Sequence, residues 1–133
     1  MKTSKHVLII DDETDIRGLL FMTLQRMGYN TSCAEDLTHA FELLSDKSFD
    51  LCLTDLKLPD GSGIDIVKRL QQSKKPLPVI VITAHGSMDV AVESMKYGAF
   101  DFINKPVNLN NLRALINNAL LVNDNVSAQL SIA

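Results

Sequence analysis

The 133-residue sequence is poor in cysteine, in long apolar runs and in clustered positive charge. No apolar run approaches membrane-spanning length and the N-terminus lacks the apolar segment of a signal peptide, so we expect a cytoplasmic protein with no membrane partner. The only two cysteines, Cys33 and Cys52, fall in predicted strands and lack the spacing of a metal site. Reduced thiols in the core are expected rather than a disulfide.

Positive charge is neither abundant nor concentrated. The 13 Lys and Arg residues are outnumbered by 16 Asp and Glu, which gives a net charge of −3, and they form no cluster. Nucleic-acid interfaces depend on such clusters, so this segment is not expected to contact nucleic acid directly. A content of 46% hydrophobic and 22% charged residues is typical of a globular chain, and the length fits one domain with a core.

The apolar residues follow two periods that alternate along the chain. Continuous runs typical of strands buried on both faces occur at 7–10, 51–53 and 79–83, and weaker strands are predicted at 29–34 and 100–104. Helical spacing predicts helices at about 15–27 and 88–97 and around the apolar stripes 37–44, 64–70 and 109–120. The predicted helix caps are Asp36, Ser87 and Asn108, and the predicted stops are Gly28 and Gly98.

This strict alternation of five strand–helix units predicts an α/β protein with a parallel sheet covered by helices on both faces. The expected architecture is a doubly wound, flavodoxin-like (βα)5 three-layer sandwich with strand order 2-1-3-4-5 and the three most apolar strands in the centre. The periodicity fades from Asn123, so residues 1–122 are expected to form the domain and residues 123–133 a tail or the start of a linker.

Polar side chains end four of the predicted strands, at the edge where open α/β sheets bind ligands. They are Asp11 and Asp12 after the first strand, Asp55 after the third, Thr83 after the fourth and Lys105 after the fifth. Neighbouring carboxylates repel one another unless one is protonated or a cation joins them. A set of oxygen ligands without His or Cys suits a hard ion such as Mg²⁺.

The same residues suit phosphoryl chemistry. A carboxylate such as Asp55 can act as a nucleophile and form an aspartyl-phosphate. The metal ion and Lys105 would neutralise charge on the transferring oxygens, because phosphoryl transfer depends chiefly on positioning and electrostatics.

Four segments carry these residues in order, each at the end of a predicted strand. They are Ile10-Asp11-Asp12-Glu13, Thr54-Asp55-Leu56-Lys57-Leu58-Pro59 with Gly61 and Gly63, Ile82-Thr83-Ala84, and Gly98-Ala99-Phe100-Asp101-Phe102-Ile103-Asn104-Lys105-Pro106. Together they are highly specific, and over residues 5–122 the chain resembles the receiver domain of two-component response regulators.

The resemblance implies a role for each site residue. Asp55 would accept a phosphoryl group from a sensor histidine kinase, and Lys105 would bind a phosphoryl oxygen. Mg²⁺ would be held by Asp11, Asp12, Asp55 and the backbone carbonyl of Lys57. The domain would not be an enzyme beyond promoting its own phosphorylation and dephosphorylation.

The resemblance also implies a switch. Phosphorylation would draw Thr83 inward and let the aromatic ring of Phe102 turn in behind it. This change would reshape the face formed by the fourth helix, fifth strand and fifth helix, which would control an output, expected to be transcription. A homodimer through that face is a further implied interaction. The Lys105–Pro106 bond is expected to be cis, as in the family.

Three other functions compete with this interpretation. A flavodoxin-like mononucleotide binder would need amides and hydroxyls after the first strand, where Asp11, Asp12 and Glu13 would repel phosphate. A phosphatase of the haloacid dehalogenase type would need a second acid where Lys57 stands. The remaining alternative is a binding-only pseudo-receiver scaffold without phosphoryl turnover, against which the complete set of site groups argues.

Phe21 and Met22 lie off the apolar stripe of the first helix, which flanks the predicted acidic pocket. Receivers that resemble this chain dock their kinases at that helix. A kinase contact through Phe21 or Met22 is therefore our hypothesis.

Overall fold

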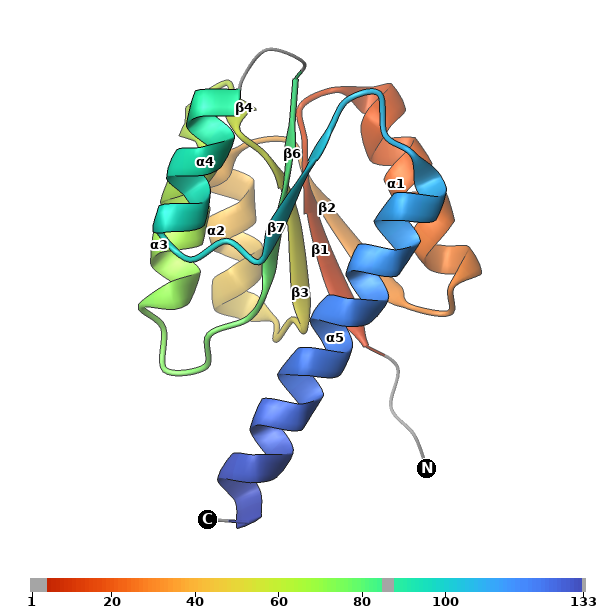
Figure 1. Cartoon of the computed structure of the whole chain (residues 1–133). Coiled ribbons are helices and arrows are strands. Elements are labelled where there is room, and N and C mark those ends of the chain that lie inside the picture. The colour runs from red at the N-terminus through yellow and green to blue at the C-terminus, as the bar shows by residue number, and fades with distance from the viewer. Residues whose placement is uncertain (1–4, 85–87, 133) are drawn as a thin grey trace.

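The structure, a computed structural model, describes residues 5–84 and 88–132, with 123–132 described as backbone. Figure 1 shows three layers, in which a twisted sheet lies between α1 and α5 on one face and α2, α3 and α4 on the other. The sheet strands are β1 (His6–Ile10), β2 (Asn30–Ala34), β3 (Leu51–Asp55), β6 (Val79–Thr83) and β7 (Asp101–Asn104). The helices are α1 (Thr14–Arg26), α2 (Leu37–Asp46), α3 (Gly63–Gln71), α4 (Met88–Lys96) and α5 (Leu109–Ile132).

All neighbouring strands of the sheet are parallel, and their order is β2-β1-β3-β6-β7. Two short strands, β4 (Lys57–Leu58) and β5 (Gly61–Ser62), form a separate antiparallel pair. Counting only the five strands of the main sheet, the order is therefore 2-1-3-4-5. This confirms the predicted doubly wound fold and places the three most apolar strands at the centre.

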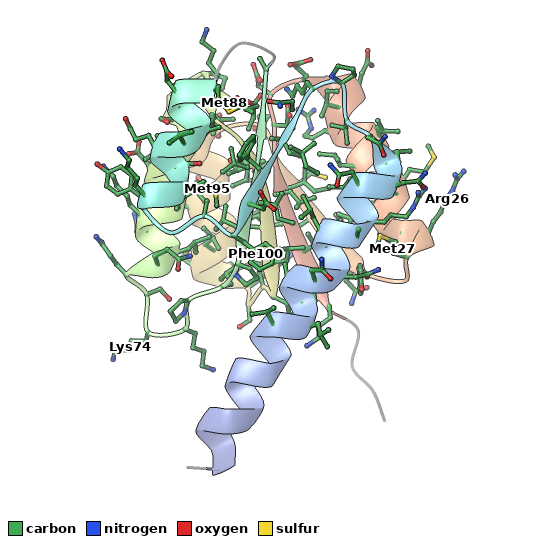
Figure 2. All side chains as sticks on the ribbon, in the orientation of Figure 1. Arg26, Met27, Lys74, Met88, Met95 and Phe100 are labelled. Carbon is green, nitrogen blue, oxygen red and sulfur yellow. The ribbon has the colours of Figure 1, made fainter. Side chains whose placement is uncertain are left out.

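The central strands are apolar throughout because each face of the sheet is covered. Alternate residues point to opposite faces. Leu8 and Ile10 pack with α2, α3 and α4, whereas Val7 and Ile9 pack with α1 and α5. Phe100, just before β7, joins the second of these clusters (Figure 2).

The predicted helix boundaries are largely confirmed. The Asp36 carboxylate accepts a hydrogen bond from His39 N at 2.8 Å, and the Asn108 side chain accepts one from Asn111 N at 3.0 Å, as helix caps do. Gly28 and Gly98 follow α1 and α4 with φ of 88° and 109°, a conformation that favours glycine. The predicted cap at Ser87 lies outside the described residues.

Two features differ from expectation. The β4–β5 pair was not predicted, because strands of two residues are too short to produce a hydrophobic period. Helix α5 continues to Ile132, past the point at which the periodicity fades, because helical hydrogen bonds within a segment do not require an apolar face against the core. The division into a domain at 1–122 and a tail at 123–133 stays a prediction.

The structure also bears on the predictions of reduced cysteines and of a chain without a membrane-spanning segment. Cys52 is buried, Cys33 is half-buried, and both are free thiols. Burial raises the pKa of each thiol, so both are protonated at neutral pH. Within the described ranges, no helix has both the length and the apolar character that crossing a bilayer requires.

The close approach of α3 to the end of β3 yields a stability prediction. A Cβ atom at Gly63 would overlap the carbonyl oxygen of Asp55 and lie 3.1 Å from Leu56 Cα. Gly63→Ala should therefore lower the free energy of unfolding by about 1–3 kcal/mol in urea titrations followed by circular dichroism.

Gly18→Ala is the matched control, since a Cβ at this exposed position in α1 would meet nothing within 4 Å. It should raise the free energy of unfolding by about 0.5–1 kcal/mol through helix propensity. Equal stability of the two variants would contradict the prediction.

Candidate functional site

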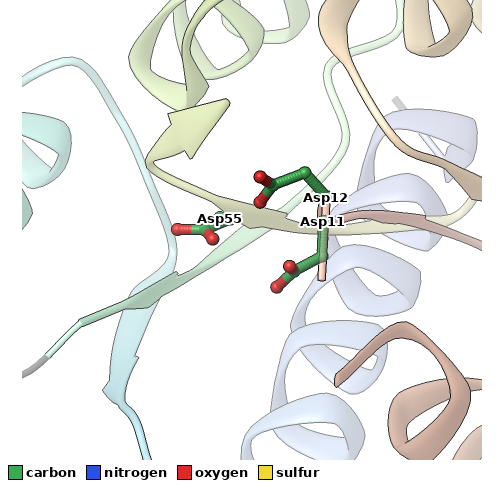
Figure 3. Close-up of side chains that lie close together, drawn as sticks. All are labelled: Asp11, Asp12 and Asp55. Carbon is green, nitrogen blue, oxygen red and sulfur yellow. The ribbon is translucent and has the colours of Figure 1, made fainter. Parts of the chain in front are cut away.

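The end of β1 and the end of β3 bring three carboxylates together. The two strands are neighbours, with Ile10 opposite Thr54, so the residues that follow in each strand lie side by side. One carboxylate oxygen each of Asp11, Asp12 and Asp55 lies within 4.8 Å of the others (Figure 3). The predicted meeting of these acids at one edge of the sheet is thus present in the structure.

Lys105 joins this cluster from the segment that follows β7, the strand at one end of the sheet. Its backbone N–H donates to Thr83 O at 2.8 Å, which ties the end of β7 to the end of β6. Its Nζ lies 3.0 Å from Asp55 Oδ2, 3.3 Å from Asp11 Oδ2 and 2.9 Å from Glu13 Oε1. One ammonium group therefore serves three carboxylates.

The surroundings of Asp11 disfavour its ionised form. Its side chain is fully buried, and its Oδ1 accepts a hydrogen bond from Glu13 N at 2.9 Å. Its Oδ2 accepts no hydrogen bond from any described residue, although the Lys105 ammonium is near. Burial, together with the charge of Asp55, raises the pKa of Asp11 despite the opposing effects of the Glu13 N–H and Lys105.

The carboxylates have the opposite effect on Lys105. Burial alone would lower the pKa of its ammonium group. The hydrogen bonds to Glu13 and Asp55 outweigh burial and raise the pKa, so Lys105 is charged at neutral pH. The lysine is thus a permanent cation beside Asp55.

The donor atoms of the site fit a hard divalent cation. Its side-chain donors are carboxylate oxygens, and the unpaired Oδ2 of buried Asp11 lies within the cluster. The four acids Asp11, Asp12, Glu13 and Asp55 also carry more negative charge than Lys105 can neutralise. A cation among them would relieve the repulsion.

Asp55 is held at both carboxylate oxygens. Oδ1 accepts a hydrogen bond from the backbone N–H of Lys57 at 3.2 Å, and Oδ2 accepts one from Lys105 Nζ. Its side chain faces a cavity of about 360 Å³ that is also lined by Asp12, Thr83 and Lys105. There is thus room beside Asp55 for a small anionic group. The predicted metal-binding role of the Lys57 carbonyl stays a prediction.

The two residues of the predicted switch lie on neighbouring strands. Thr83 ends β6 with 1% of its surface exposed, and its hydroxyl donates only a long hydrogen bond of 3.4 Å to Ala84 O. Phe102 lies on β7 opposite Val81, half-buried against the cluster that includes α4. The Lys105–Pro106 bond is cis, as predicted.

The sequence did not reveal two contacts of the site. Glu13 belongs to the acidic run after β1, and its proximity to Asp12 was the only sign of its ion pair with Lys105. No pattern in the sequence marked Asp60. Its Oδ1 accepts from Leu37 N at 2.8 Å, and its Oδ2 accepts from Thr38 N at 3.0 Å and Thr38 Oγ1 at 2.7 Å.

Asp60 therefore joins the β4–β5 pair to the start of α2. The N–H of Leu37 and those of the next residues are the groups that a helix leaves without internal partners. Their hydrogen bonds, that of Leu37 N first, lower the pKa of Asp60, so its carboxylate stays ionised. Because the β4–β5 pair directly follows Asp55, the contact positions the loop beside the acidic cluster.

The fold and site define an α/β domain with an acidic pocket at the carboxyl edge of its sheet. Residues 7–117 match the model of the response regulator receiver domain. The chain therefore belongs to the response regulator receiver domain family.

Relatives and solved structures agree with this membership. The chain is 54% identical over 113 residues to the response regulator protein PilR of Pseudomonas aeruginosa, which covers 85% of this chain and 25% of PilR. It is 33% identical over 120 residues to the transcriptional regulatory protein FixJ of Bradyrhizobium diazoefficiens, which covers 90% of this chain and 58% of FixJ. The chain thus spans less than two thirds of the length of either protein.

A receiver domain protein from Clostridium thermocellum superposes with a TM-score of 0.85 at 32% identity, covering 92% of this chain and 98% of that one. Full-length FixJ from B. japonicum gives 0.86 at 31% identity, covering 96% of this chain and 63% of that one.

Asp11→Asn tests the electrostatic description of the cluster. It removes a buried charge whose raised pKa opposes folding at neutral pH. The metal-free variant should unfold with a free energy about 1–2 kcal/mol higher than the wild type, measured in urea at pH 7 with EDTA. A carboxyl group whose pKa is raised by folding destabilises the folded state only at a pH where it is ionised. The difference in free energy of unfolding between the variant and the wild type should therefore narrow as the pH falls toward 3.8, the ordinary pKa of the group.

Asp12→Asn is the matched control, because Asp12 is exposed and its removal should change the free energy by less than about 0.5 kcal/mol. A metal-free Asp11→Asn protein less stable than the wild type would show that the ion pair with Lys105 dominates.

Proposed function

We propose that this receiver domain accepts a phosphoryl group on Asp55 from a sensor histidine kinase, with Mg²⁺ bound by the acidic cluster. The observation that carries the proposal is the arrangement of Asp11, Asp12 and Asp55 within 4.8 Å, with Lys105 Nζ 3.0 Å from the Asp55 carboxylate. The cytoplasmic location of the protein stays a prediction.

The transfer is a displacement at phosphorus. A carboxylate oxygen of Asp55 forms a bond to phosphorus while the bond from phosphorus to the kinase's histidine nitrogen breaks, and that nitrogen keeps the electron pair. Lys57 N and Lys105 Nζ hold the two oxygens of Asp55 before the reaction. This fixed orientation favours the transfer because phosphoryl transfer depends on positioning.

Charge is the second requirement of the transfer. Mg²⁺ held by Asp11, Asp12, Asp55 and the Lys57 carbonyl would neutralise negative charge on the phosphoryl oxygens. Lys105 supplies a fixed positive charge 3.0 Å from the Asp55 carboxylate, where it would neutralise charge on a phosphoryl oxygen. The same groups would support slow hydrolysis of the aspartyl-phosphate, the only other reaction that we propose for the domain.

The switch follows from the position of Thr83 in the same cavity as Asp55 and Lys105. A phosphoryl oxygen is a stronger acceptor for its hydroxyl than the carbonyl of Ala84 at 3.4 Å. When Thr83 moves toward Asp55, the half-buried ring of Phe102 on the adjacent strand turns into the space behind it. Two arrangements of this pair would report the phosphorylation state.

The face formed by α4, β7 and α5 would transmit this change. It already exposes large apolar side chains along its helices, among them Met88 and Met95 on α4 (Figure 2). Val90 and Val92 on α4 and Leu121 and Val122 on α5 are exposed as well. We propose that this face forms a homodimer and that the output is transcription, which is supported by the similarity to the transcriptional regulatory protein FixJ.

Phosphorylation of the isolated chain tests the proposal against a binding-only scaffold. Incubation with acetyl phosphate and Mg²⁺ should add one phosphoryl mass to the wild type in intact-protein mass spectrometry. Asp55→Asn should abolish the gain, and EDTA should suppress it by more than about tenfold because the charge on the reacting oxygens would no longer be neutralised. A folded protein with no Asp55-dependent mass gain, and no spectral change with beryllofluoride, would favour the scaffold.

The kinase contact is tested on α1. Phe21 and Met22 are 41% and 50% exposed, which confirms that they lie off the buried face of the helix. Phe21→Glu or Met22→Glu should slow phosphotransfer from a histidine kinase by roughly tenfold or more, since either would place a charge in an apolar contact. Phosphorylation by acetyl phosphate should be unchanged.

Val122→Glu is the control for these variants, because Val122 is equally exposed at 49% but lies on α5. It should leave both phosphodonors unaffected. Equal losses with kinase and acetyl phosphate for the α1 variants would refute a role in kinase contact.

A further inference from the structure

The edge of the sheet opposite Asp55 carries a second cavity, which the proposed phosphotransfer does not use. It has a volume of about 530 Å³ and lies where α2 and α3 end, together with the segments that follow them. Figure 1 shows these two helix ends at the edge of the sheet where the chain enters β1 and β3, whereas Asp55 ends β3. The volume falls within the range of small-molecule sites.

The floor of this cavity is apolar and partly aromatic. Phe41, Leu44, Phe49 and Leu77 line it, and each is half-buried. The ring of Phe49 is fixed by contact with His6, at a centroid distance of 4.5 Å. A preformed aromatic surface of this kind suits a planar ring.

The rim of the cavity is positively charged. Lys47, Arg69 and Lys75 line it, and no Asp or Glu is among its lining residues in the described part of the chain. The chain as a whole carries a net charge of −3, so this concentration of cations is local. It creates a positive potential over a low-dielectric floor, which attracts anions.

These cations are not neutralised by carboxylates of the described residues. Lys47, Arg69 and Lys75 make no ion pair with a carboxylate of any described residue, whereas Lys105 pairs with three. Arg69 instead lies over the Phe41 ring, with its guanidinium carbon 4.5 Å from the ring centroid. This contact holds the guanidinium at the boundary between floor and rim, with its N–H donors available to a ligand.

We propose that this cavity binds a small phosphorylated molecule with a planar ring, of the nucleotide class. The ring would lie against Phe49 and the Arg69 guanidinium that covers Phe41, and the phosphates would contact Lys47, Lys75 and the N–H donors of Arg69. The combination explains both halves of the lining, since inorganic phosphate alone would leave the aromatic floor unused. A bounded cavity also suits a small molecule better than an extended acidic peptide.

Binding is measured by amide chemical shifts of the whole chain titrated with ADP in magnesium-free buffer, so that the acidic cluster takes no part. Signals of the lining residues should shift and saturate at sub-millimolar ADP. Adenosine and pyrophosphate should each bind more weakly by roughly tenfold, because each engages only one half of the site. Asp55→Asn should bind ADP like the wild type, which separates this result from failure of the phosphotransfer proposal.

A charge-matched pair of variants tests the assignment to the cavity. Arg69→Gln with Lys75→Gln should weaken ADP binding by roughly tenfold, since both remove a cation from the rim. Lys68→Gln with Lys74→Gln makes the same charge change at neighbours that do not line the cavity, and should change affinity less than about twofold. Figure 2 shows Lys74 in the loop after α3. Circular dichroism and phosphorylation by acetyl phosphate confirm folding of both proteins.

Four results would overturn the proposal. They are no shift of the lining residues with ADP, equal binding of pyrophosphate and ADP, equal losses in the two double variants, and tighter binding of a polyglutamate peptide than of ADP.

Discussion

The repulsion between carboxylates held at one edge of the sheet is the constraint on which the site depends. The pairing of β1 with β3 places Asp11 beside Asp55, and a shift of either strand would disrupt the packing of its buried side chains on both covered faces of the sheet. Burial of those strands therefore keeps together charges that would otherwise separate. Lys105, which follows β7, relieves part of the repulsion, and a bound cation would relieve the remainder. The free energy of folding thus offsets the electrostatic repulsion that remains among the carboxylates, and a bound cation would reduce that repulsion.

Much of this was predictable because the fold alternates two clear periods. The three central strands are short apolar runs that end at polar residues such as Asp55 and Thr83, so strand ends and site residues coincide in the sequence. Contacts between segments without a period were not predictable. The ion pair of Glu13 with Lys105 depends on side-chain direction, and the β4–β5 pair is too short to leave a pattern. The extent of α5 was missed because its last turns need no apolar stripe.

The two edges of the sheet differ in chemical character. At the carboxyl edge, Asp11, Asp12 and Asp55 gather around one lysine. At the amino edge, Lys47 and Arg69 surround an aromatic floor without a neighbouring acid in the described lining. Strand polarity produces this separation, since every parallel strand begins at one edge and ends at the other. The acidic cluster and the cavity proposed to bind an anion thus lie at opposite edges of the sheet. Salt in the solvent screens the charges of one from the other over that separation.

The contact of Asp60 with the start of α2 has a structural consequence for the loop after Asp55. A helix end that is closed by a residue from a distant loop does not tolerate a change in that loop's length, because an insertion would withdraw the carboxylate from Leu37 and Thr38. The N–H groups of Leu37 and Thr38 would then lose this acceptor, and only the Asp36 cap would remain at the start of α2. The hydrogen bonds between Asp60 and the start of α2 therefore restrict the length of the loop that carries Asp60.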